Sequence, residues 1–192
     1  MTAAVALSPI QSDALRELCN VCSGRAADAL SRLIGERPVE LGLPDELPRG
    51  DVASHIGGAD AKVVGARVEL AGPLRGELWL VLAECDAAEL SGLLEEQGQR
   101  EVAVWALYET ANIVASACLN ALYALTRLTV VPSVPEVLVG EAAKVVARLP
   151  RTSDAPVIVT ELALREPKVR AKLLFAPHAE SVAPLLKAMG LR

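Results

Sequence analysis

The hydrophobic pattern of the chain predicts two long helices. In the first, apolar positions recur three and four residues apart over roughly residues 10–34, which places them on one helical face. Ser8 and Gln11 have the spacing of a capping box that opens this helix, and Gly35 is suited to end it. The second predicted helix covers roughly residues 101–127 and has a more continuously apolar body.

Shorter apolar runs predict two antiparallel β-hairpins, each followed by a helix. The expected strands are residues 62–70 and 76–84, joined by a turn at Ala71-Gly72-Pro73, and residues 156–165 and 168–175, joined by a turn at Glu166-Pro167. Asp86 and Glu89 form a capping-box pattern for a helix that ends near Gln97 and Gly98. The last helix is expected over roughly residues 178–189.

The connecting segments have weaker patterns. Residues 36–60 are rich in Pro and Gly and predict a loop or short strand, followed by one helical turn near residues 52–56. Thr129–Val131 predicts a short strand, residues 134–136 a loop, and Gly140–Leu149 a short amphipathic helix.

Elements occur in the same order in both halves, and matching residues lie 92 positions apart. The matches that define this offset are Glu17 with Glu109, Asn20 with Asn112, and Leu93-Leu94 with Leu185-Leu186. A constant offset across whole units indicates duplication, and each half has too few strands for a stable sheet. We therefore predict an α/β (α+β) fold with pseudo-twofold symmetry, in which both hairpins join in one sheet covered by helices. It would be a single domain over residues 1–192, made of repeats at about 8–98 and 100–190.

Composition narrows the class of protein. Hydrophobic residues make up 52% of the chain and aromatic residues 3%, so the core must consist mainly of Ala, Val, Leu and Ile. The net charge of −5 disfavours binding to nucleic acid. The longest uncharged apolar stretch, Thr110–Thr126, contains Asn, Ser and Thr and is short for a membrane span, so it predicts a buried helix. With no signal-peptide pattern at the N-terminus, we expect a cytoplasmic protein that does not bind membranes.

The cysteines favour buried thiols over a metal site. Cys19-x-x-Cys22 is half of a metal-binding pattern, but no second Cys-x-x-Cys follows it. In the second repeat the same positions hold Ala111 and Val114, which indicates that small apolar residues are needed there. We therefore expect no metal or other cofactor in this chain.

The repeated Glu-x-x-Asn is the strongest indication of chemistry. Residues three apart on a helix point to nearly the same side. Asn is a poor residue for a helix interior, yet two of the three asparagines occupy matching helical sites after a Glu. Such a pair lacks the adjacent base that a nucleophile requires. It can position water and engage a cation, which is the kind of contribution that matters in phosphoryl transfer. The structural alternative is that Asn20 and Asn112 form hydrogen bonds within the core or to a loop, and that each Glu is solvated. Asn120 has no Glu partner and is expected to be structural.

The two long helices resemble the twin motifs of the CheC/CheX/FliY family, chemotaxis phosphatases that act on phosphorylated CheY. The similarity is carried by residues 15–33, LRELCNVCSGRAADALSRL, and residues 108–135, YETANIVASACLNALYALTRLTVVPSVP. Two intact pairs in a chain of this length look most like CheC.

The resemblance implies two active sites, Glu17 with Asn20 and Glu109 with Asn112. In the family, Asn orients the water that attacks the aspartyl phosphate, and Glu pairs with a lysine of the receiver domain. It also implies that the Mg²⁺ belongs to the receiver, and that CheD is a possible partner. Members often have Gly before the Asn, where this chain has Cys19 and Ala111.

Two other interpretations remain open from the sequence. A non-catalytic module on the same scaffold could bind a receiver domain or a CheD-like partner. An unrelated α/β enzyme is less favoured, because the chain has no Gly-rich phosphate loop, metal cluster or His-centred acid–base pattern.

Overall fold

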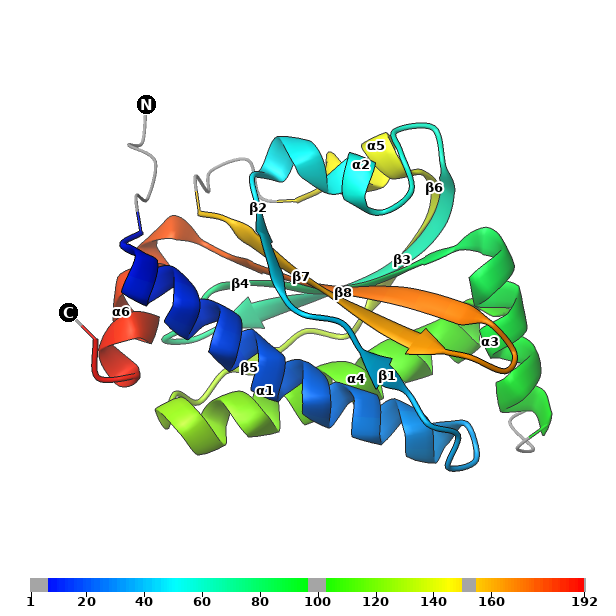
Figure 1. Ribbon diagram of the computed structural model, residues 1–192, viewed down its shortest axis with the longest axis horizontal. Helices are drawn as coiled ribbons and strands as arrows, with labels where there is room; N and C mark the ends of the chain where they lie inside the picture. The colour runs from blue at the N-terminus through cyan, green and yellow to red at the C-terminus, as the bar shows by residue number, and fades with distance from the viewer. Residues whose placement is uncertain (1–6, 97–102, 150–154, 192) are drawn as a thin grey trace.

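The computed structural model describes residues 7–96, 103–149 and 155–191, which form one antiparallel sheet with helices on both faces (Figure 1). The helices are α1 (Pro9–Leu33), α2 (Val52–His55), α3 (Glu84–Glu96), α4 (Ala103–Thr126), α5 (Ala142–Val146) and α6 (Ala179–Ala188), with a 3₁₀ turn, η1 (Arg49–Asp51). The strands are β1 (Glu40–Leu41), β2 (Asp45–Leu47), β3 (Lys62–Ala71), β4 (Gly76–Ala83), β5 (Val131–Pro132), β6 (Glu136–Glu141), β7 (Val157–Leu164) and β8 (Val169–Pro177). Both long helices and both hairpins therefore match the sequence prediction.

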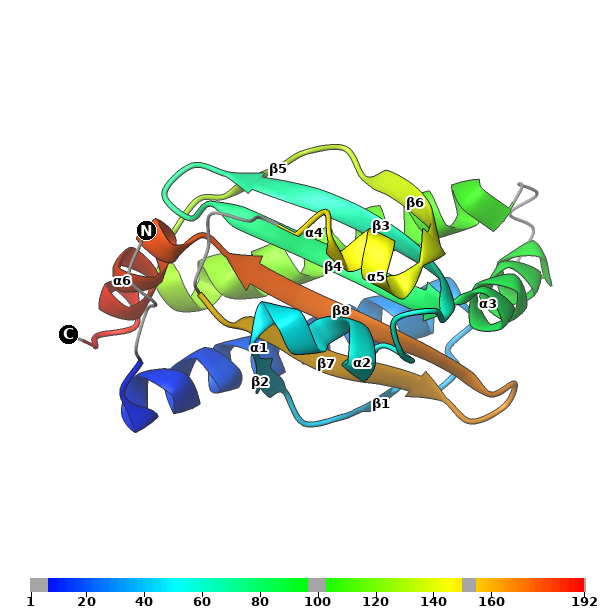
Figure 2. The same ribbon diagram turned by 90° about the horizontal axis from the view of Figure 1, so that it is seen from above.

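The sheet joins the two hairpins along their inner strands. Its order is β1-β7-β8-β4-β3-β5, with β2 also paired to β7 and β6 to β3, and all these pairs are antiparallel. At the centre, Leu80 of β4 pairs with Leu173 of β8, and the residue 92 positions before Leu173 is Val81. The 92-residue offset thus exchanges β4 with β8 about the centre of their pairing, as a pseudo-twofold axis requires. This arrangement, seen from above in Figure 2, confirms the predicted fold class.

Three layers result from this arrangement. Helices α1 and α4 lie side by side on one face of the sheet and run in opposite directions, while α2 and α5 cover part of the other face (Figures 1 and 2). The central strand β4 is buried along nearly its whole length, because it lies between these two layers and between two other strands. This double burial explains why the run Gly76–Ala83 is so continuously apolar.

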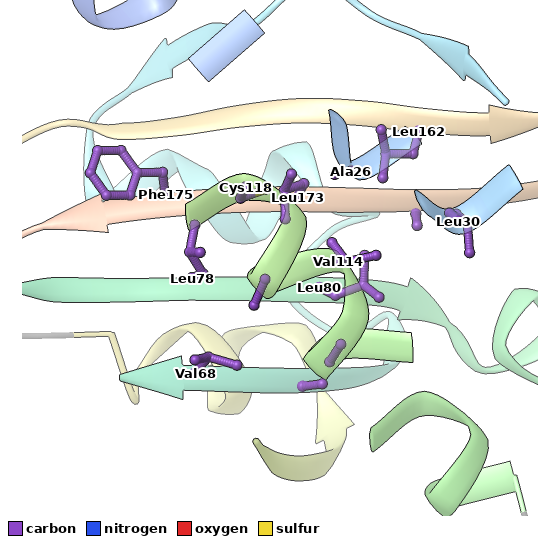
Figure 3. Packing of buried hydrophobic residues seen from close by; sticks show 14 of the residues in the cluster. Ala26, Leu30, Val68, Leu78, Leu80, Val114, Cys118, Leu162, Leu173 and Phe175 are labelled. Carbon is purple, nitrogen blue, oxygen red and sulfur yellow. The ribbon is translucent and has the colours of Figure 1, made fainter. Parts of the chain in front are cut away.

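The larger core lies between the long helices and the sheet. Figure 3 shows Ala26 of α1 and Val114 and Cys118 of α4 near side chains of the strands, including Leu80 and Leu173. A second cluster, which includes the fully buried Trp79, packs beneath α2 and α5 on the opposite face. The small side chains of the helices let them approach the sheet closely, which suits a chain with so few aromatic residues.

The region after α4 differs from the prediction. Residues 134–136 were expected to form a loop and Gly140–Leu149 a helix, but β6 occupies Glu136–Glu141 and the helix is limited to α5. Strand β6 forms because the edge of β3 offers it backbone partners, with Lys62 opposite Glu141. The short strand expected at Thr129–Val131 is β5, which begins at Val131.

The start of α3 is also different. Asp86 was expected to cap this helix, but the helix begins at Glu84, directly after β4. The Asp86 carboxylate instead accepts a hydrogen bond from the backbone of Arg170, and its partial burial raises its pKa. The predicted helix end at residues 97–98 and the junction between the two repeats lie outside the described residues. The division into repeats stays a prediction.

Candidate functional site

Helix α1 displays the first Glu-x-x-Asn pair on its outer side. The predicted capping box is present: the Gln11 backbone N–H donates to Ser8 Oγ at 3.3 Å, and the Ser8 N–H donates to Gln11 Oε1 at 2.9 Å. From this start, Leu18 turns to the sheet and is buried. Glu17 is exposed and Asn20 is half-buried, so both side chains can be reached from solvent.

Helix α4 displays the second pair more openly. Glu109 and Asn112 are both exposed. The two residues between them are buried, and Thr110 Oγ1 donates to the carbonyl oxygen of Ala106 at 2.7 Å. The helix is therefore fixed by its inner face, while the carboxylate and the carboxamide stand one turn apart on the outside.

The fold does not bring the two pairs into one site. Where the helices pack together, the Cys118 thiol lies 3.5 Å from the carbonyl oxygen of Cys22. Because the helices are antiparallel and rise 1.5 Å per residue, Asn20 and Asn112 are about 12 Å apart along the helix direction. The structure thus contains two separate Glu-x-x-Asn surfaces on the same layer of the molecule.

Both pairs lie away from the apolar cavity at the interface between helices and sheet. An apolar cavity of about 30 Å³ lies between the long helices and the sheet, and its lining includes Cys22, Cys118 and Phe175 but none of the four site residues. An exposed carboxylate and amide on a convex helix suit contact with a large partner better than enclosure of a small substrate. The exposed side chain of Asn112 therefore does not bond within the core, whereas Asn20 is half-buried.

The charged surroundings of the two pairs are different. Glu109 is the one charged residue in the sequence between Trp105 and Thr126. Glu17, in contrast, follows Arg16, whose guanidinium is 3.0 Å from the Asp13 carboxylate. Within residues 7–96, 103–149 and 155–191, no hydrogen bond or ion pair involves the side chains of Glu17, Asn20, Glu109 or Asn112. Each carboxylate can therefore accept hydrogen bonds from an incoming cation, and each amide can bond to a water.

The thiols near the site are protonated. Cys19 and Cys118 are buried and Cys22 is half-buried, and all are free. Burial raises the pKa of Cys22 to about 12, and it raises the pKa of Cys19 and Cys118 as well. Such thiols are poor nucleophiles and poor metal ligands. In the part of the chain that the structure describes, no three His, Cys, Asp or Glu side chains gather as a metal site would require.

Known proteins resemble this chain in both sequence and fold. The chain is 28% identical to the CheY-P phosphatase CheC of Bacillus subtilis over 94% of both proteins. Its fold matches that of Thermotoga maritima FliY with a TM-score of 0.74, at 22% identity over 97% of this chain and 98% of that one. Sequence and fold are both similar to those of the CheC/CheX/FliY family.

A similar fold also occurs in a solved complex of two proteins. A chain of the CheX–CheY–BeF₃–Mg²⁺ complex from Borrelia burgdorferi matches with a TM-score of 0.60, at 15% identity over 85% of this chain and 99% of that one. No family model matches the sequence. None of the helices in the described ranges is long and apolar enough to cross a membrane.

Sequence reasoning did not single out the neighbours of each pair. One turn before Glu109, Trp105 is 57% exposed, and its ring contacts that of Tyr108. The matching positions on α1 hold Asp13 and Arg16. The 92-residue offset could have revealed this difference, since it aligns aromatic with charged residues one turn before each Glu.

Proposed function

We propose that this protein hydrolyses the aspartyl phosphate of a CheY-type response regulator in chemotaxis or two-component signalling. The observation that supports the proposal most is the display of two Glu-x-x-Asn pairs at equivalent places on the solvent side of twin helices, away from the apolar cavity. Such a site suits a substrate that is itself a folded protein. The similarity to a CheY-P phosphatase over 94% of the chain supports the same reaction.

In the proposed mechanism, both this protein and the receiver contribute groups to the reaction. The carboxamide of Asn20 or Asn112 holds a water in line with the acyl phosphate, which supplies positioning rather than covalent chemistry. The carboxylate of Glu17 or Glu109 pairs with a lysine of the receiver and fixes the orientation of the two proteins. The Mg²⁺ is expected to reside in the receiver, so this chain needs no metal or other cofactor. Since the proposed partner is a cytoplasmic signalling protein, we propose that the reaction takes place in the cytoplasm.

Phosphate release from a phosphorylated receiver tests this mechanism. The variant that carries both Asn20→Ala and Asn112→Ala should lose the stimulated release and keep the same circular dichroism spectrum and thermal midpoint. Asn120→Ala is the matched control, because Asn120 is also an exposed helical asparagine but has no Glu three residues before it. Release that continues unchanged in the double variant would refute the mechanism.

The competing function is a docking module without catalysis. One observation favours the docking function for the α1 surface: Glu17 has charged neighbours on its helix, whereas Glu109 has none. This interpretation predicts that the protein binds a BeF₃-activated receiver but adds nothing to the rate of phosphate release. Binding to a CheD-like partner stays an expectation from the sequence resemblance, and a pull-down with purified CheD would test it.

A further inference from the structure

The two Glu-x-x-Asn pairs are preceded by different contacts at the same two helical positions. On α1, Asp13 and Arg16 form an ion pair of 3.0 Å. On α4, 92 residues later, Trp105 and Tyr108 form an aromatic pair, with ring centroids 5.5 Å apart and planes tilted by 59°. Each pair of residues is three apart, so each stabilises its own helix turn locally. Helix stability alone therefore does not explain why one site carries rings and the other carries charges.

Trp105 lies on the same helical face as the second Glu-x-x-Asn pair. It stands four residues before Glu109 and seven before Asn112, a spacing that returns to one side of a helix. Its side chain is 57% exposed, whereas Trp79, the other tryptophan of the chain, is 1% exposed. The fold thus leaves a large aromatic surface in water directly beside the proposed reactive pair, and Tyr108 restricts its orientation.

An exposed tryptophan in this position is suited to bind a protein. Tryptophan and tyrosine are enriched among the residues that contribute most to protein–protein affinity, because they bury much area with few rotatable bonds. The surrounding helix carries little charge, since Glu109 is the one charged residue between Trp105 and Thr126. A partner that reaches Glu109 with a cation therefore meets uncharged side chains on the rest of this face, and Trp105 offers it apolar contact.

We propose that Trp105, held by Tyr108, is the docking anchor of the Glu109/Asn112 site and becomes buried against an apolar patch of the receiver. The proposal rests on the phosphatase function proposed above and goes beyond it, because it assigns different binding to the two sites. The Glu17/Asn20 site lacks this anchor. It depends on charge, so it binds the same receiver more weakly and loses more affinity as salt is added.

Steady-state kinetics with one of the two sites inactivated test whether the sites bind the receiver differently. In an Asn20→Ala background, only the α4 site is intact, and Trp105→Ala should raise KM for the phosphorylated receiver by at least about tenfold while kcat changes little. Trp105→Phe should restore most of the affinity, because an aromatic ring remains. In an Asn112→Ala background, Trp105→Ala should leave KM unchanged. Equal effects in the two backgrounds would overturn the proposal.

A transplant gives the complementary result. Asp13→Trp together with Arg16→Tyr, introduced into the Asn112→Ala background, places the aromatic pair before Glu17. It should lower KM of the α1 site. Asp13→Ala with Arg16→Ala is the control, and it should not lower KM. A transplant that fails to lower KM, in a protein with an unchanged thermal midpoint, would contradict the role of the aromatic pair.

Fluorescence separates this inference from the phosphatase function. Acrylamide should quench Trp105 in the free protein, and a BeF₃-activated receiver that lacks tryptophan should protect it. Trp105→Phe supplies the signal of Trp79 alone. Protection of Trp105 without phosphate release would support the anchor while it refutes catalysis. Phosphate release with Trp105 still open to acrylamide would overturn the anchor while it leaves catalysis intact.

Discussion

Replacing Gly24 with alanine should stabilise the protein and impair its first site. Gly24 lies inside α1, four residues after Asn20, and therefore on the face that carries the Glu17/Asn20 pair. Apart from its chain neighbours and the adjacent backbone of its own helix, a Cβ atom built on Gly24 meets no heavy atom within 4 Å, so the change causes no clash. The energetic effect on folding should then be the intrinsic difference between the two residues in a helix.

The size of this effect follows from helix propensity. Glycine is less favourable than alanine in a helix interior by about 0.8–1.0 kcal/mol. For a chain of this length, a gain of about 1 kcal/mol raises the thermal midpoint by about 2–4 °C. Gly92 is the matched control, since it is an exposed glycine inside α3 with equally open space around its Cβ position. Gly92→Ala should give a similar gain.

The two substitutions should differ in their effect on activity. Nothing within the described chain requires the space at Gly24, so we expect that the space serves a partner whose backbone approaches this turn closely. In an Asn112→Ala background, Gly24→Ala should reduce phosphate release, and Gly92→Ala should not. The measurements are thermal unfolding by circular dichroism and phosphate release from a phosphorylated receiver. A loss of stability with Gly24→Ala, or a gain without any loss of release, would refute the reasoning.

Three further predictions concern groups outside the reactive pairs. Arg67→Ala should cost about 3 kcal/mol or more in urea unfolding, because it leaves the Glu77 carboxylate, whose side chain is 5% exposed, without its guanidinium partner. Glu161→Gln should be less stable than the wild type at pH 7, because Lys172, 2.6 Å away, lowers the pKa of Glu161. The stabilisation of the folded state by this ion pair is present above the ordinary carboxyl pKa of 4.5. The difference should vanish in acid unfolding experiments as the pH falls through the lowered pKa. Cys22, with a pKa of about 12, should resist iodoacetamide at pH 8 in the folded protein and react after denaturation, as mass spectrometry can show.

Local sequence patterns were sufficient to predict the helices and hairpins that depend little on residues far away in the chain. The capping box at Ser8 and the apolar period of α1 define a helix without help from the rest of the chain. The hairpin β3–β4 is also local, because its two strands are joined by turn residues that follow one another directly in the sequence. Strand β6 could not be found in this way, because none of its six residues is fully buried and it forms through its pairing with β3. The 92-residue offset does relate β6 to β2, so this offset carried a signal that the local pattern lacked.

The candidate site was likewise predictable only in part. The Glu-x-x-Asn pairs were predictable, because the same spacing occurs twice at matching positions. Their exposure depends on which face of each helix the sheet covers, and a sequence pattern constrains this only weakly when α4 is apolar on most of its sides. Trp105 was missed for that reason, since an aromatic residue in an apolar helix is usually part of the core.

The comparison of the two helices shows which positions the fold constrains. Inward positions keep small or apolar residues in both copies: Cys19 matches Ala111, Ala26 matches Cys118, and Leu30 matches Leu122, and all six are buried. The outward positions before each Glu hold charges in one copy and rings in the other. Packing against a shared sheet explains the inward similarity but places no demand on the outer face. A difference confined to that face is therefore best explained by what each helix meets outside the chain, and this argues that the two sites bind their partners by different means.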